Sequence, residues 1–133
     1  MEMDIRKKEF TYKGLTIEEL KKLDVREFAK FLNSRQRRTI LRNFQEVENF
    51  INRSKEKIKK NKKVKTHQRD LVIVPQMIGM KIGVYNGNNF ITTEITGEML
   101  GHKFGEFAPT RTRVKHSKSG VGSTKGSKHK SKK

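Results

Sequence analysis

The chain has 133 residues, enough for one compact domain with extensions but too few for two full hydrophobic cores. Its 32 Lys and Arg side chains against 14 Asp and Glu give a net charge of +18 and a pI of about 10.4, which favours a polyanionic partner, nucleic acid before a membrane surface. No apolar run approaches the length that spans a bilayer, and the absence of cysteine excludes disulfides, cysteine-ligated zinc and thiol chemistry.

The first predicted elements are two short helices with explicit start signals. Thr16 and Glu19 have the spacing of a capping box, which predicts a helix over about 17–23. Asp24 and Glu27 repeat the box, so a second helix is predicted directly after it. The apolar face of that second helix consists of Val25, Phe28, Ala29 and Leu32. Two capped helices in tandem predict a tight helical hairpin.

A third and longer helix is predicted over about 35–60, with Asn33 or Ser34 able to cap it. Apolar residues recur along it at helical spacing, namely Ile40, Phe44, Val47, Ile51 and Ile58. Its first turn carries three arginines, which oppose the positive end of the helix dipole and therefore suggest an anionic partner. Its far end is rich in lysine, which fits either an RNA-facing segment or a solvated helix end and linker.

From residue 71 the apolar periodicity changes from helical to extended. The run 71–74 has the pattern of a buried strand. Alternating residues predict a hairpin with strands near 80–85 and 90–95, and Asn86-Gly87 suits its turn because both residues readily take positive φ. Helices followed by strands predict the α+β class.

The hairpin is followed by a short helical segment and then by a basic tail. Thr96 can cap the segment, and Gly101 or Gly105 can end it. No acidic residue follows Glu106, and the tail is too polar to bury a core, so it is predicted to be disordered in isolation. The predicted division is a helical extension with a basic linker (1–63), a small core with the hairpin and short helix (64–112), and a Gly/Ser/Lys tail (113–133).

No residue grouping indicates catalysis or a cofactor. His102 and Glu106 at i, i+4 can face the same side of a helix, but a metal site needs a third ligand that the sequence does not nominate. His102 then serves packing or phosphate contact. Gly79, Gly83 and Gly87 lack the strand-turn-helix context of a phosphate loop, so they mark backbone turns or close approach of another backbone. We therefore predict no enzyme, no metal and no cofactor.

Aromatic residues stand mostly at core spacings, which argues against a stacking platform for single strands. Recognition of folded RNA through shape and phosphates fits the sequence better. DNA remains an alternative, although no helix-turn-helix or zinc-finger pattern occurs.

Several segments resemble one known family. Asn86-Gly87-Asn88, Ile95 and the run 100–111, LGHKFGEFAPTR, together resemble the signature of the small-subunit ribosomal protein S-nineteen family. Further segments are similar to its archaeal and eukaryotic branch, whose eukaryotic member is called S-fifteen: these are 10–14, 34–38, 65–67 with 69–70, and 84–87. The resemblance covers about residues 9–124.

The resemblance implies a non-catalytic constituent of the small ribosomal subunit in the cytoplasm. It implies binding to the 3′ domain of the small-subunit rRNA in the subunit head, ribosomal protein S-thirteen as a neighbour, and a tail that extends toward the decoding region and the A-site tRNA. Two departures are visible: Asn88 stands where the family usually has Lys or Arg, and residues 125–133 lack the family's usual ending. A free nucleic-acid chaperone or regulator acting off the ribosome is the alternative function.

We predict that basic and turn residues from every part of the chain contact RNA. They are Arg35, Arg37, Arg38, Lys62, Lys63, Lys65, His67, Arg69, Lys81, Asn86, Gly87, Lys103, Arg111, Arg113, Lys115, His116, Lys118 and Lys125.

Overall fold

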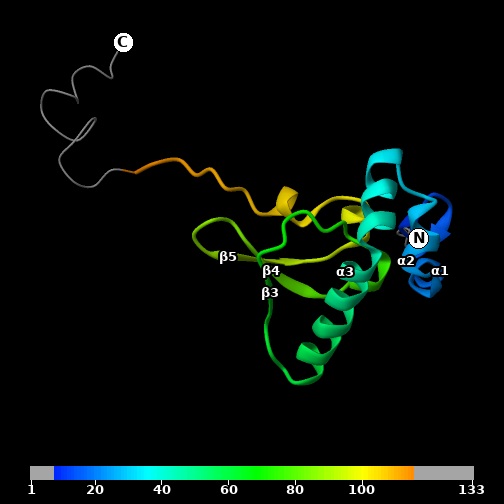
Figure 1. Ribbon diagram of the computed structural model, residues 1–133, viewed down its shortest axis with the longest axis horizontal. Helices are drawn as coiled ribbons and strands as arrows, with labels where there is room; N and C mark the ends of the chain where they lie inside the picture. Colours follow the sequence, from blue (N-terminus) through cyan, green and yellow to red (C-terminus); the bar gives the residue numbers. More distant parts are fainter. Residues whose placement is uncertain (1–7, 116–133) are drawn as a thin grey trace, which may run out of the picture.

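The computed structural model describes residues 8–115, and Figure 1 shows how their elements are arranged. The helices and strands are β1 Thr11–Tyr12, β2 Leu15–Thr16, α1 Ile17–Lys22, α2 Val25–Ala29, α3 Ser34–Lys59, β3 Val64–Thr66, β4 Lys81–Tyr85 and β5 Phe90–Glu94. Three 3₁₀ turns are η1 Pro75–Met77, η2 Gly97–Met99 and η3 Phe104–Phe107. Helices in the first half and a three-stranded sheet after them confirm the α+β class.

The predicted capping boxes start α1 and α2. The backbone N–H of Thr16 donates to Glu19 Oε2 at 2.9 Å, and the Glu19 N–H donates to Thr16 Oγ1 at 3.4 Å. At α2 the Asp24 N–H donates to Glu27 Oε2 at 3.2 Å. Each box satisfies backbone donors that the first helical turn leaves without partners.

The predicted hairpin of α1 and α2 is wrong. α1 packs against η1, and α2 packs against α3. One polar contact helps to direct α1, since Gln76 Nε2 of η1 donates to the carbonyl of Leu23 at 2.9 Å. Local capping therefore set where both helices begin, whereas distant partners set how they pack.

The long helix α3 forms close to its predicted limits. Asn33 caps it, because its side chain accepts from the Gln36 N–H at 3.2 Å. Asn43 interrupts the helix with φ −116° and ψ 24°, which places a kink in its first half. Most of the predicted apolar positions face the core, but Ile58 is 44% exposed because residues 55–60 extend past the core into solvent.

The sheet has the order β3-β4-β5, with β3 parallel to β4 and β4 antiparallel to β5. Val64 pairs with Ile82 and Thr66 with Val84, and all four side chains are buried. The predicted hairpin is confirmed. β3 was not predicted, since one valine within a lysine-rich stretch carries no strand pattern.

The prediction of a strand at 71–74 is only half right. All four residues are buried, but they lie outside the sheet along the segment 101–104. The Ile73 N–H donates to the His102 carbonyl at 2.8 Å, and the Phe104 N–H donates to the Leu71 carbonyl at 3.2 Å. A regular ladder does not develop, because the partner segment turns at Gly101, where φ is +80°.

The hairpin turn is centred one residue later than Asn86-Gly87. The Asn86 N–H donates to the Asn89 carbonyl at 3.0 Å, which makes Gly87 and Asn88 the central pair. Gly87 has φ +100°, the conformation for which glycine is favoured. The Asn86 side-chain carbonyl accepts from the backbone N–H groups of Asn88 and Asn89 at 3.0 and 2.7 Å, so Asn86 stabilises the loop instead of forming its tip.

One hydrophobic cluster joins the helices to the sheet. It contains Leu20, Phe28, Ile40, Ile73 and Phe104, each at most 1% exposed, among many others. Figure 1 shows α3 between the two short helices and the sheet, with the β4–β5 loop and the C-terminal segment extending away from the helices. The single core is confirmed, and no second core lies on either side of the predicted boundary at residue 63 within the described residues.

Candidate nucleic-acid interface

Positive charge on the described surface has no acidic partner. Within residues 8–115 the only ion pair within 4.0 Å joins His102 and Glu106, so no Lys or Arg there pairs with a carboxylate. The capping carboxylates of Glu19 and Glu27 accept from backbone N–H groups instead. A surface of unpaired cations attracts phosphates, and their binding releases condensed counterions.

Three arginines form a ridge along the first half of α3. Arg35, Arg38 and Arg42 border a surface hollow of about 410 Å³, and this group is called the arginine ridge below. Arg35 and Arg38 were predicted as RNA contacts, whereas Arg42 was missed. Its position four residues after Arg38 was the available signal, because residues at i and i+4 share a helix face.

Arg37, in the same turn, has a different partner. Its Nε donates to the Ala29 carbonyl at 3.2 Å, and its Nη2 donates to the carbonyls of Lys30 and Leu32 at 3.2 and 3.0 Å. Ala29 is the last residue of α2, and Lys30 and Leu32 follow it, at the end of a helix where backbone carbonyls no longer have a full set of helical donors. Arg37 therefore joins α2 to α3, and its guanidinium is largely occupied by the protein.

Arg69 holds three separate parts of the core domain. Its Nη1 donates to the Tyr85 carbonyl at 2.6 Å, and its Nη2 donates to the carbonyls of Gly105 and Ala108 at 2.9 and 2.7 Å. The half-buried guanidinium thus joins the end of β4 to both ends of η3. Arg37 and Arg69 thus both hold backbone carbonyls of the folded chain, and for that reason the RNA surfaces proposed below are built from the other predicted residues.

Lysines surround a groove between the end of α3 and the sheet. Lys62, Lys63, Lys65 and Lys81 line this space of about 550 Å³, together with the exposed part of Ile58 and other residues. All four lysines were predicted as RNA contacts, and all four are exposed. The parallel pairing of β3 with β4 brings Lys65 beside Gly83, and so unites residues far apart in sequence.

An aromatic group at the sheet edge was missed by the sequence analysis. The rings of His67, Tyr85 and Phe90 lie with centroids 4.6 to 5.1 Å apart, and Lys65 Nζ lies 5.1 Å from the Phe90 centroid. No spacing of residues in the sequence predicts this group, because its members come from three chain segments that meet only through sheet pairing. His67 is the exposed member.

The His102–Glu106 pair does not make a metal site. His102 Nδ1 lies 2.5 Å from Glu106 Oε2, and both side chains are about half exposed. Among the described residues no group of three or more His, Cys, Asp or Glu side chains is placed to hold a metal ion. The imidazole also packs on the ring of Phe107, with centroids 6.0 Å apart, so His102 contacts the last two residues of η3.

The remaining predicted contacts are distributed around the hairpin and the C-terminal segment. Lys103 is half-buried, and Gly87 of the β4–β5 loop is exposed. Arg111, Arg113 and Lys115 are exposed on an extended segment. The predicted contacts His116, Lys118 and Lys125 lie outside the described residues. In the part of the chain that the structure describes, no helix is long and apolar enough to cross a bilayer.

A small core whose Lys and Arg side chains lack carboxylate partners within residues 8–115 is typical of the class of structural proteins that bind nucleic acid. The family model of ribosomal protein S19 matches residues 33–116. A small ribosomal subunit protein, uS19, from Methanocella arvoryzae is 47% identical over 125 residues, covering 93% of this chain and 87% of that protein. The chain belongs to the ribosomal protein S19 family, and it is a structural, rRNA-binding constituent of the small ribosomal subunit.

Proposed function

We propose that this chain binds the 3′ domain of the small-subunit rRNA in the subunit head, beside ribosomal protein S-thirteen. The 3′ domain, the head and the neighbour are what the family resemblance implies, and the observation that supports RNA binding is the absence, among residues 8–115, of any carboxylate partner for Lys and Arg. Cations kept apart from carboxylates are available to phosphates, and folded rRNA presents phosphates at close and regular spacing.

The proposed contacts form three surfaces. The arginine ridge lies on α3, the lysines of the groove lie between α3 and the sheet, and the third surface lies at the hairpin loop and C-terminal segment. The residues concerned are Arg35, Arg38, Arg42, Lys62, Lys63, Lys65, His67, Lys81, Asn86, Gly87, Lys103, Arg111, Arg113 and Lys115. Basic residues on three surfaces suit an RNA that surrounds a small protein. An RNA that touched only one face would need only one basic patch.

The tail is proposed to extend toward the decoding region and the A-site tRNA. His116, Lys118 and Lys125 belong to this part of the proposal, which rests on the family resemblance and on the tail's charge. The different ending of residues 125–133 separates the tail into a part similar to the family and a part that is not.

The test is a binding titration of the full chain against a transcript of the 3′ domain at several salt concentrations. Each neutralised phosphate should contribute about 0.7 to 0.9 log units of affinity per log unit of salt. An unrelated folded RNA of equal length is the control, and it should bind more weakly. An affinity that hardly changes with salt would overturn the proposal.

Sedimentation distinguishes a head protein from a chaperone that acts off the ribosome. The chain should travel with small subunits in a sucrose gradient and remain bound as salt is raised to the level that removes loosely attached proteins. A chain found mainly in the light fractions would favour the chaperone function instead.

A further inference from the structure

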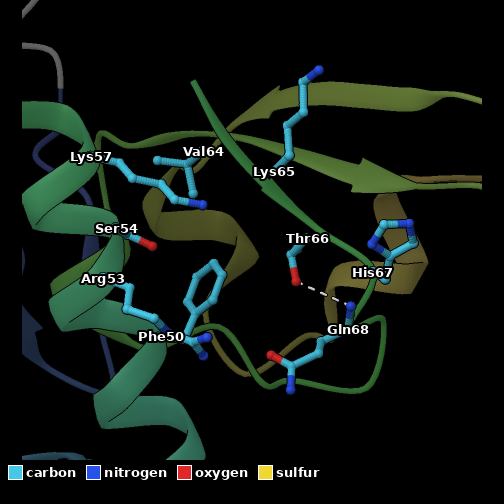
Figure 2. A pocket seen from close by; sticks show the side chains of 9 residues that line it. All are labelled: Phe50, Arg53, Ser54, Lys57, Val64, Lys65, Thr66, His67 and Gln68. Atoms are coloured by element: carbon cyan, nitrogen blue, oxygen red, sulfur yellow. Dashed lines mark hydrogen bonds between the residues drawn. The ribbon is translucent and has the colours of Figure 1, made fainter. Parts of the chain in front are cut away.

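A small pocket lies between the second half of α3 and β3, next to the lysine groove, with which it shares Val64 and Lys65. It has a volume of about 290 Å³, and Figure 2 shows the side chains that line it. Arg53, Ser54 and Lys57 reach it from α3, and Thr66 and Gln68 reach it from β3 and the residues after it. No Asp or Glu is among its lining residues.

The Ser54 hydroxyl is buried in this pocket without a partner. Ser54 is 1% exposed, and its Oγ makes no hydrogen bond within the described structure. Figure 2 shows the hydroxyl directed from the helix toward the strand. Burying a hydroxyl away from water without a protein partner costs free energy. A ligand that accepts a hydrogen bond from this hydroxyl would recover that cost.

The neighbouring side chains favour an anion as that ligand. Arg53 Nε donates to the Asn49 carbonyl at 3.3 Å, while its two terminal nitrogens have no hydrogen-bond partner in the described residues. Lys57 extends across the pocket toward Val64 in Figure 2. Two cations and one orphaned hydroxyl, with no carboxylate beside them, suit a tetrahedral oxyanion that accepts several hydrogen bonds at once.

Thr66 completes the opposite wall. It is 7% exposed, and its Oγ1 accepts from the Gln68 N–H at 3.1 Å, which leaves its hydroxyl hydrogen free to donate. Phe50 forms an apolar wall that is itself fixed by Phe104, with ring centroids 5.4 Å apart. Lys65 belongs to the rim only, since its ammonium lies over the Phe90 ring on the other side of the strand.

We propose that this pocket takes one phosphate group of the RNA backbone, held by Arg53, Lys57 and the hydroxyl of Ser54. The inference rests on the proposed function and adds to it a defined binding site for a single phosphodiester group. The same chemistry would hold free inorganic phosphate, so the experiment separates the two sources.

The first variant is Ser54→Ala in the full chain. Because the hydroxyl has no partner in the free protein, its removal should leave the denaturant midpoint unchanged or raise it. The affinity for the 3′-domain transcript should fall on the order of tenfold, the size expected of a hydrogen bond to a charged group. A lowered midpoint with unchanged RNA affinity would mean that the hydroxyl is structural, and would overturn the inference.

The second variant is the double substitution Arg53→Gln with Lys57→Gln. Both side chains serve one phosphate, so the salt slope should fall by about 0.7 to 0.9 and not by twice that amount. Lys55→Gln is the matched control, because Lys55 is exposed on the same helix and does not line the pocket. Equal affinities for the double variant and the control would overturn the inference.

The third experiment titrates the full chain with inorganic phosphate. Binding is monitored through the amide resonances of Ser54 and Thr66. Shifts that saturate with phosphate, combined with full RNA affinity in the pocket variants, would assign the pocket to free phosphate and overturn the RNA assignment. The proposed function is judged separately by the unsubstituted chain: salt-dependent binding of the transcript there, with no effect of any pocket variant, would sink only this inference.

Discussion

Arg69 and Gly105 are joined by two hydrogen bonds that run in opposite directions. The Gly105 N–H donates to the Arg69 carbonyl at 2.9 Å, and Arg69 Nη2 donates to the Gly105 carbonyl at 2.9 Å. The backbone of Gly105 thus bonds both the backbone and the side chain of Arg69, which fixes η3 against the segment after β3. Residues 36 positions apart in sequence form one rigid unit.

Replacing Arg69 by lysine should destabilise the fold although the charge is kept. A lysine has one ammonium at the end of a flexible stem and does not reach the Tyr85, Gly105 and Ala108 carbonyls together, as the planar guanidinium does. We expect the free energy of unfolding to fall by about 2 to 3 kcal/mol, the range for lost hydrogen bonds to a charged group. Urea denaturation measures it, and Arg111→Lys, an exposed site, should change stability by less than about 0.5 kcal/mol.

Substitution of Gly105 by alanine should also be costly, for a steric reason. A Cβ at this position would lie 3.1 Å from the Arg69 carbonyl oxygen, which the hydrogen bond from the Gly105 N–H holds in place. We expect a loss of about 1 to 3 kcal/mol. At Gly83 the nearest atoms, Lys65 Cγ and Phe90 Cβ, are 3.4 Å away, so Gly83→Ala should cost less. Equal denaturation midpoints for the two variants would contradict this account.

Neighbouring arginines in α3 should separate RNA binding from stability. Arg35→Gln combined with Arg38→Gln should lower the salt slope of RNA binding by about 0.7 to 0.9 for each phosphate that is no longer neutralised, and should leave unfolding almost unchanged. Arg37→Gln should show the reverse: the slope stays, while the free energy of unfolding falls by about 1 to 2 kcal/mol because carbonyls after α2 lose their donor. Titration and denaturation of the same protein samples supply both readouts.

Tyr12 should give the fold a dependence on alkaline pH. Burial raises the pKa of the Tyr12 phenol above its ordinary value of 10.0. The neutral phenol is therefore favoured in the folded chain, so its contribution to stability is fully present below about pH 10 and is lost as pH rises through the folded pKa.

The measurement compares the unfolding midpoint of the wild type with that of Tyr12→Phe between about pH 8 and about pH 11. The phenylalanine ring keeps the contact with Phe28, whose centroid lies 5.9 Å from that of Tyr12, and has no proton to lose. Lysines also titrate in this range, so the informative quantity is the difference between the two profiles. The wild type should lose stability more steeply above about pH 10, and parallel profiles would refute the assignment.

Much of the local structure was predictable because it depends on residues close together in the chain. Thr16 with Glu19 and Asp24 with Glu27 start their helices through hydrogen bonds over three positions. The helical period located α3, and the alternation of residues located β4 and β5. The motif around 100–111 indicated the family that the comparisons confirm.

The amino-acid sequence by itself determined the helix starts, the hairpin, the α+β class, the basic character and the family, since each follows from composition, short spacing or motif. Only the tertiary structure decided which arginine side chains are hydrogen-bonded to the protein's own backbone. Arg35, Arg37, Arg38 and Arg69 are alike as cations in the sequence, yet Arg37 and Arg69 donate to backbone carbonyls that packing brings within 3.2 Å. A hydrogen bond requires a distance and an angle between groups remote in the chain, and those are fixed only when the core assembles.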